Sequence, residues 1–126
     1  MKKILLTITA AVLASVGFAQ LSGTYTINGG SATGGTNYQT FAAAFSALTS
    51  NGVSGAVTFN CIEGTYNGQV YMSSANISGT STTNTVTFQA DAGNTNEVLW
   101  QHTSYPLYMY NTNLNNVSFD GLHMKT

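Results

Sequence analysis

After residue 55 a four-residue motif of alternating apolar and polar residues, which we call the phrase, occurs three times. In each copy a valine and a phenylalanine alternate with a hydroxyl residue and a polar residue, which places both apolar side chains on one face of a strand. The copies begin 86 − 57 = 29 and 117 − 86 = 31 residues apart. Recurrence at such a period indicates a solenoid, with Val57, Val86 and Val117 stacked on adjacent parallel strands. The copies are Val57-Thr58-Phe59-Asn60, Val86-Thr87-Phe88-Gln89 and Val117-Ser118-Phe119-Asp120.

Each period also holds two further strand-like segments separated by turn residues such as Gly64 and Gly93. Three strands per period are therefore predicted. Sequential antiparallel hairpins are the alternative, but they favour strands every 8–12 residues or so without equivalent positions. The three matching copies favour the solenoid. The additional segments are 69–72 and 76–79 in the first period, and 97–101 and 107–110 in the second.

One segment, from Thr40 to Ser50, has the spacing of an amphipathic helix. Its apolar residues recur at i, i+3, i+4 and i+7, which places them on one face. Thr40 is a suitable N-cap, and Asn51-Gly52 supplies a left-handed terminator. Because about ten residues of helix are marginal alone in water, we expect this face to dock near Val57 and Phe59. The face consists of Phe41, Ala44, Phe45 and Leu48.

Residues 1–19 have the pattern of a secretory signal peptide. Lys2 and Lys3 precede an apolar run over residues 4–16, and small residues at 17 and 19 predict cleavage before Gln20. The run is shorter than the roughly 20 residues that span a membrane. We therefore expect a secreted protein, extracellular or on the outer cell surface, with no membrane span after the signal peptide is removed.

Thr, Asn, Ser and Gly make up about half of the chain from residue 20 onward, which suits strands and tight turns. The formal charge of this part is 1 − 4 = −3. A single lysine cannot neutralise a phosphate backbone, so nucleic-acid binding is excluded. Cys61 has no partner for an internal disulfide, and we expect it to be a small buried side chain. The charged residues from residue 20 onward are Lys125, Glu63, Asp91, Glu97 and Asp120.

The polar residues do not form a recognisable catalytic or metal-binding pattern. Glu63 and Asp91 lie six and five residues after their valines and could meet at one corner, but no third group accompanies them, and turn carboxylates are the plainer interpretation. His102 and His123 lack metal-binding spacing. The run from Gly29 to Gly35 lacks the lysine and the strand-to-helix context of a phosphate loop. We therefore predict no catalytic, cofactor-binding or metal-binding residue, and no cofactor.

Six aromatic residues fall between the repeated phrases, and two interpretations stay open for them. Large aromatic residues are mostly core residues, yet exposed rings can stack on sugars and form a glycan-binding strip. If Val70 and Met72 point inward, Tyr71 points outward, whereas the direction of Trp100 is undetermined. The six are Tyr66, Tyr71, Trp100, Tyr105, Tyr108 and Tyr110.

The segments 52–60, 63–66 (Glu-Gly-Thr-Tyr) and 116–122 carry a resemblance to a known family. Together with the preceding helix, their order resembles the N-terminal part of secreted pectin-lyase-like proteins that carry a C-terminal type IX secretion sorting domain. The resemblance implies an all-β fold, the start of a right-handed parallel β-helix (β-solenoid) with an N-terminal amphipathic capping helix. We expect a signal peptide at 1–19, an N-terminal strand and capping helix at 20–55, and the first β-helix coils at 56–126, incomplete at the C-terminus.

The expected function is a non-catalytic N-terminal segment of an extracellular β-helix protein, which acts as a structural scaffold or in adhesion and glycan contact. The expected partners are a glycan or cell-surface ligand and the remainder of the protein's own β-helix. The alternative is the N-terminal part of a polysaccharide lyase or glycoside hydrolase whose active site lies beyond residue 126.

Overall fold

The computed structural model describes residues 19–73, 76–110 and 114–126; residues 1–18 of the predicted signal peptide lie outside it. The fold is mostly β, with parallel strand pairing and one helix in these ranges. No helix of the described residues is long and apolar enough to cross a membrane. The helix is α1 (Phe41–Asn51), and the strands are β1 (Leu21–Ile27), β2 (Asn37–Tyr38), β3 (Val53–Cys61), β4 (Gly64–Asn67), β5 (Val70–Ser73), β6 (Val86–Ala90), β7 (Val98–Gln101), β8 (Leu107–Tyr110), β9 (Val117–Asp120) and β10 (Leu122–Lys125).

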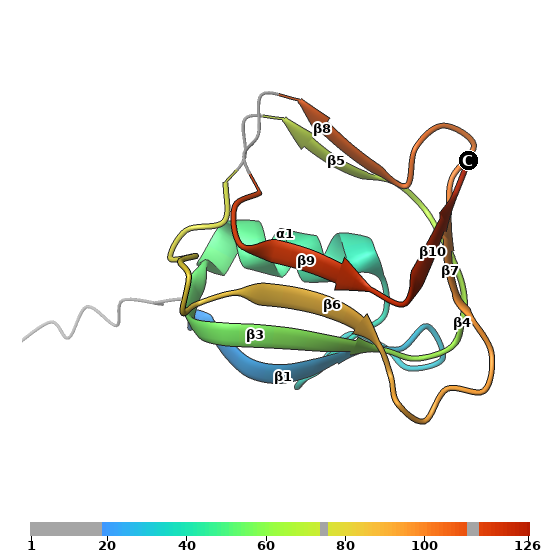
Figure 1. The fold of residues 1–126 in the computed structure, drawn as a ribbon, viewed down its shortest axis with the longest axis horizontal. Coiled ribbons are helices and arrows are strands. Elements are labelled where there is room, and N and C mark those ends of the chain that lie inside the picture. Colours follow the sequence, from blue (N-terminus) through green and yellow to red (C-terminus); the bar gives the residue numbers. More distant parts are fainter. Residues whose placement is uncertain (1–18, 74–75, 111–113) are drawn as a thin grey trace, which may run out of the picture.

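The strands form three sheets that the chain visits in a repeating order. The first sheet has the order β2-β1-β3-β6-β9, the second β10-β7-β4, and the third pairs β5 with β8. Figure 1 shows the first sheet below α1, the third above it and the second at the right. The chain passes from the first sheet to the second and third through β3, β4 and β5, and does so again through β6, β7 and β8.

The three copies of the phrase lie on neighbouring parallel strands in the predicted register. Val57 is opposite Val86, which is opposite Val117. The phenylalanines stack in the same order, with ring centroids 4.7 Å apart between Phe59 and Phe88 and 5.2 Å apart between Phe88 and Phe119. The hairpin alternative is therefore wrong, and the in-register prediction is confirmed.

Strand β1 is an additional member of this stack that the repeat did not reveal. Thr24 is opposite Thr58 and Tyr25 is opposite Phe59, although the chain here has glycine in place of the valine. Tyr25 and Tyr38 lie 5.6 and 5.7 Å from the ring of Phe59. The first phenylalanine of the stack is therefore covered by two tyrosines at this end.

The helix begins and ends as its sequence predicts. The Thr40 hydroxyl accepts a hydrogen bond from the Ala43 N–H at 3.1 Å. Gly52, with φ of 70°, donates its N–H to the Leu48 carbonyl at 2.9 Å. The predicted apolar face is buried in full.

The contacts of that face differ in part from the expectation: Phe41 packs edge-on against Tyr66 of the first period with ring centroids 5.2 Å apart, but the two closest stacked contacts are elsewhere. Phe41 stacks on Trp100 at 4.3 Å, and Phe45 stacks on Phe88 at 4.9 Å. Both partners belong to the second period rather than the first. The helix lies between the first sheet and the β5–β8 pair (Figure 1), so its aromatic side chains fill the interior and reach past Phe59.

One predicted strand segment is wrong. Residues 76–79 are not a strand but end in a turn at residues 78 and 79, and the remaining strand of the first period is β4, which starts at Gly64. The reason is steric. Gly79 has φ of 86°, and a Cβ atom there would lie 2.0 Å from the Val53 carbonyl oxygen. The main chain crosses too closely at this point for any residue with a side chain.

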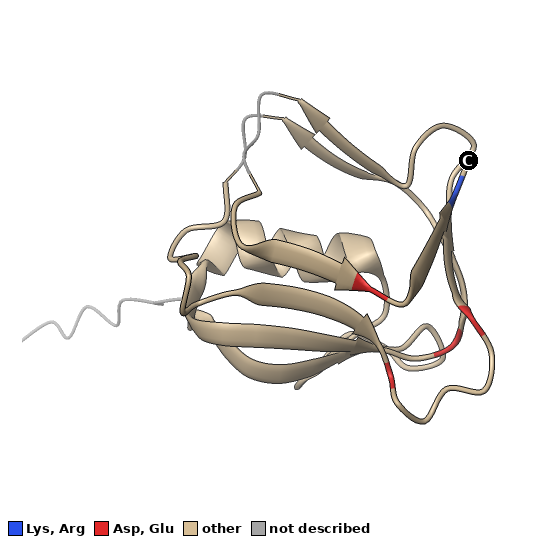
Figure 2. Cartoon of the chain, viewed as in Figure 1, with Lys and Arg blue, Asp and Glu red and all other residues tan. Residues whose placement is uncertain are grey.

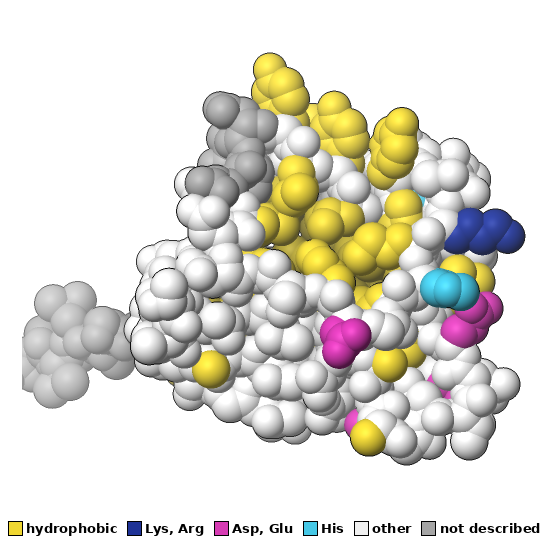
Figure 3. Space-filling model, viewed as in Figure 1, with side chains coloured by type: hydrophobic (Ala, Val, Ile, Leu, Met, Phe, Trp, Pro, Cys, Tyr) yellow, Lys and Arg dark blue, Asp and Glu magenta, His cyan; other side chains and the backbone are white. Residues whose placement is uncertain are grey.

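The last strands of the three sheets leave their inward side chains partly uncovered. Met109 on β8 is 49% exposed and Met124 on β10 is 44% exposed, whereas their neighbours Met72 and Trp100 in the preceding strands are almost fully buried. The apolar surface between β8 and β9 is visible at the centre of Figure 3. The core is thus closed at the β1 end and open at the β9 end.

Candidate functional site

A pair of tyrosines projects from the outer face of the third sheet. Val70 and Met72 of β5 are buried, so Tyr71 between them points outward. Tyr71 is in register with Tyr108 of β8, and their rings stack with centroids 5.1 Å apart and planes 6° apart. Tyr71 is 61% exposed and Tyr108 36%. The conditional prediction for Tyr71 is confirmed.

Two further exposed tyrosines extend this surface, which we call the tyrosine strip (Tyr71, Tyr105, Tyr108 and Tyr110). The Tyr105 ring lies 6.3 Å from that of Tyr108. The loop that carries Tyr105 is attached to β5 because the Gln69 amide donates a 2.8 Å hydrogen bond to the Tyr105 carbonyl. Figure 3 shows the hydrophobic side chains standing out along the edge formed by β5 and β8.

The other two aromatic residues of the predicted set are core residues. Trp100 is 1% exposed, stacks on Phe41 and donates its indole N–H to the Gly68 carbonyl at 2.9 Å. Tyr66 is buried with its hydroxyl 2.9 Å from the Ile27 carbonyl and 2.8 Å from the Ile62 carbonyl. Burial raises the pKa of the Tyr66 hydroxyl, which keeps it protonated and able to donate.

The acidic residues gather along the corner between the first and second sheets, away from Lys125 (Figure 2). The Glu63 carboxylate accepts hydrogen bonds from the backbone N–H groups of Thr95 and Asn96, and from both side chains. These bonds, the Asn96 N–H first, lower the pKa of Glu63. The carboxylate therefore fastens the loop before β7 to the corner after β3.

Asp91 has a separate and local partner. Its carboxylate accepts a hydrogen bond from the Gly93 N–H of its own turn at 2.9 Å. Glu63 and Asp91 thus hold different parts of the same loop between β6 and β7, each through its own hydrogen bonds, and among the described residues no hydrogen bond joins the two carboxylates to a shared group. The described residues contain no group of three or more His, Cys, Asp or Glu able to hold a metal ion.

The histidines lie at the edges of the second sheet. His123 forms an ion pair with Glu97 in which both side chains are more than half exposed, and such surface pairs contribute little to stability. The His102 Nδ1 accepts a hydrogen bond from the Ser104 N–H at 3.1 Å.

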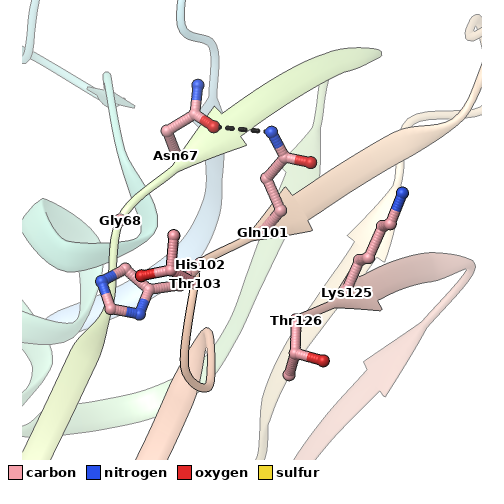
Figure 4. A pocket seen from close by; sticks show the side chains of 7 residues that line it. All are labelled: Asn67, Gly68, Gln101, His102, Thr103, Lys125 and Thr126. Atoms are coloured by element: carbon pink, nitrogen blue, oxygen red, sulfur yellow. Dashed lines mark hydrogen bonds between the residues drawn. The ribbon is translucent and has the colours of Figure 1, made fainter.

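A pocket of about 390 Å³ lies where the second sheet turns toward the third. It is lined by polar side chains at the ends of the strands, and Figure 4 shows the Gln101 amide donating to Asn67 there, at 2.8 Å. His102 and Thr103 also line the pocket, so the loop that begins there continues to Tyr105 of the tyrosine strip. The sequence pattern does not predict this pocket. In the sequence, the one feature that marks the pocket is a polar residue at the end of each strand. The strand register then places Asn67, Gln101 and Lys125 side by side.

Cys61 is a fully buried core residue. Burial raises the pKa of its thiol to about 12. A thiol in this state is neither a nucleophile nor a metal ligand at neutral pH. The prediction of a small buried side chain is confirmed.

Comparisons with protein-family models, with curated proteins and with solved structures find no match to this chain.

Proposed function

We propose that residues 20–126 begin a right-handed parallel β-helix in an exported protein, and that this segment is a non-catalytic scaffold that contacts a neutral glycan through the tyrosine strip. The scaffold part is supported by strands 29 and 31 residues apart that pair in parallel register, and by the repeated passage through three sheets. The resemblance to secreted β-helix proteins with a type IX sorting domain points the same way. In that arrangement the remainder of the protein's own β-helix covers the open layer at β8, β9 and β10.

The tyrosine strip is the observation that carries the binding proposal. Four exposed tyrosines on one face make an apolar surface with hydroxyl groups at its rim. Exposed patches of this kind mark binding surfaces, and tyrosine combines a large contact area with few rotatable bonds. Aromatic rings pack against the C–H faces of sugars, while Asn67 and Gln101 in the adjoining pocket can exchange hydrogen bonds with sugar hydroxyls.

The charge distribution favours a neutral glycan over an acidic one. From residue 20 onward the chain has four carboxylates and one lysine. An acidic polysaccharide would meet net repulsion, and Lys125 alone offers little compensation in water. Two of the carboxylates, Asp91 and Glu63, accept hydrogen bonds from loop N–H groups rather than pointing at a shared site.

Binding is tested by electrophoresis of the purified protein through gels that contain neutral or acidic polysaccharides. Replacing Tyr71 and Tyr108 by alanine should weaken retardation by the neutral glycan about tenfold or more, because truncating an anchoring aromatic residue costs more than about 1 kcal/mol. Tyr71→Phe keeps the ring and should bind almost normally. Thr65→Ala, an exposed substitution on β4, is the control. Unchanged retardation of the double alanine variant would refute the strip as the site.

The rival function, an enzyme with its active site beyond residue 126, is distinguished by activity. A lyase assay and a reducing-sugar assay should show no cleavage by residues 20–126 or by the full-length secreted protein. Cleavage by the full-length protein alone would favour the rival. Cleavage that is lost on replacing Glu63 or Asp91 would overturn the non-catalytic proposal.

Export is tested by N-terminal sequencing of secreted material, which should begin at Gln20.

A further inference from the structure

The two tyrosines at the centre of the strip are arranged for more than ligand contact. Tyr71 and Tyr108 occupy equivalent positions on adjacent parallel strands. The planes of their rings are nearly parallel, and the ring centroids are 5.1 Å apart. Both are open to solvent. Within the described residues, neither hydroxyl has a hydrogen-bond partner in the protein. Two phenols are therefore held side by side where a soluble oxidant can reach both.

We propose that Tyr71 and Tyr108 form an oxidative modification site that yields a dityrosine cross-link between β5 and β8. Each phenol loses one electron and one proton to become a tyrosyl radical. The two radicals join through the ring carbons next to their oxygens, and the hydrogens on those two carbons then move to the ring carbonyl oxygens, which restores both phenols. The oxidant is hydrogen peroxide acting through a haem peroxidase. One peroxide accepts the two electrons and two protons and becomes two waters.

The register of the strands makes this coupling intramolecular. Groups held together in a fold react at a far higher effective concentration than free molecules. Exposed side chains change rotamer within picoseconds to nanoseconds, so the rings can turn from the stacked position to bring their reacting carbons together. The paired strands keep the two residues opposite one another throughout.

The other tyrosine pairs are less suitable. Tyr25 and Tyr38 are 5.9 Å apart with planes 51° apart, and both pack against Phe59 in the core. Tyr105 is 6.3 Å from Tyr108 at 35° and belongs to a loop rather than to a paired strand. The geometry thus selects one pair among several neighbours.

A cross-link here would connect successive periods of the chain. It would close a loop of 108 − 71 = 37 residues, and a covalent bond across such a loop restricts the unfolded chain as a disulfide does. From residue 20 onward the chain has a single cysteine, which is buried. Oxidised tyrosines would supply the covalent connection between strands that this cysteine cannot.

The test treats the purified protein with horseradish peroxidase and hydrogen peroxide at low protein concentration, with no glycan present. The expected product is a monomer that has lost two hydrogen atoms, shows the blue fluorescence of dityrosine, and unfolds at a higher denaturant concentration. Peptide mapping by mass spectrometry should join the peptides that contain Tyr71 and Tyr108.

Tyr71→Phe and Tyr108→Phe should each abolish this product, since phenylalanine preserves the ring stack but cannot form the radical. Tyr105→Phe and Tyr25→Phe should leave the yield unchanged. A cross-link that joins Tyr108 to Tyr105, or that forms only between molecules, would overturn the proposal. So would an unchanged yield in the Tyr71→Phe variant.

Discussion

Two aromatic stacks between parallel strands lie on different sheets, one on the inner face of the first sheet and the other on the outer face of the third. The inner stack of Phe59, Phe88 and Phe119 has ring separations of 4.7 and 5.2 Å, and the outer pair of Tyr71 and Tyr108 has one of 5.1 Å. The interplanar angles are 12°, 14° and 6°. Parallel register alone therefore produces both stacks.

The surroundings of the two stacks differ completely. Phe88 is fully buried and is contacted by the rings of Phe41 and Phe45 as well as by its two stack neighbours. Tyr71 has one ring neighbour and is 61% exposed. Because apolar burial and packing supply most of the energy of such contacts, the inner stack should stabilise the fold and the outer one should serve surface chemistry.

The largest expected effect is at the centre of the inner stack. Phe88→Ala should lower the free energy of unfolding by about 3–5 kcal/mol, because the cavity would be surrounded by packed rings on every side. Phe119→Ala should cost clearly less, since Phe119 is only partly buried. Urea denaturation of both variants measures this, and equal losses would show that stacking rather than burial sets the energy.

Tyr66 separates the effect of burial from that of residue type, because it is a tyrosine in the hydrophobic core. Tyr66→Phe keeps the ring against Phe41 but removes the one hydroxyl proton that lies between the two carbonyls of Ile27 and Ile62; the Ile27 carbonyl still accepts from the Ile62 N–H. The expected loss of stability is about 1–2 kcal/mol. The same substitution at Tyr71 is the matched control and should have no measurable effect. A neutral result at Tyr66 would mean that water replaces the hydroxyl.

Glu63 shows that a partly exposed residue at a corner can still be anchored. Its hydrogen bonds hold its pKa below the usual value of a glutamate. Its contribution to stability is therefore present at pH values above the unfolded pKa and is lost as the pH falls through the folded pKa. In urea titrations at several pH values, Glu63→Gln should be less stable than the parent at neutral pH, and the difference should shrink on acidification. Asp120→Asn, at an exposed carboxylate with no hydrogen-bond partner among the described residues, should show no such trend.

The smallest expected effect is at the outer pair. Tyr71→Ala should change the free energy of unfolding by no more than about 0.5 kcal/mol, since exposed positions rarely contribute more. Thermal and urea denaturation both report this value. A loss comparable to that of Phe88→Ala would remove the distinction between the stacks.

The sequence predicted the inner stack and the helix because each depends on local spacing. The Val–Phe alternation specified both the strand and its inward face, and the spacing from Phe41 to Leu48 specified the helix face. The sequence predicts an N-terminal strand within residues 20–55, but not its place beside β3, because Gly23 and Tyr25 replace the valine and phenylalanine of the phrase. The sequence predicts a strand at 76–79 where the structure has none, because the close approach of Gly79 to Val53 exists only in the folded chain.

The candidate site was predictable only in part. The outward direction of Tyr71 followed from its buried neighbours, but its partner Tyr108 depends on the register between β5 and β8. The inward direction of Trp100 depends on where β7 begins. The contact of Glu63 with Thr95 and Asn96, more than 30 residues away, depends on how two corner loops align. These contacts form between residues of successive periods, so they cannot be predicted from the spacing of residues within one period.

The pairing of strands one full period apart also governs how quickly this protein can fold. Residues that pair between β3, β6 and β9 are separated by 29 or 31 positions, so little of the sheet can form from neighbours in the chain. Closing a loop of that length costs about 3 kcal/mol of chain entropy, plus a constant, before the first ladder bond forms. Each later period meets a similar penalty. We therefore expect refolding on the millisecond-to-second scale typical of non-local β proteins, with α1 as the one element able to organise from local contacts.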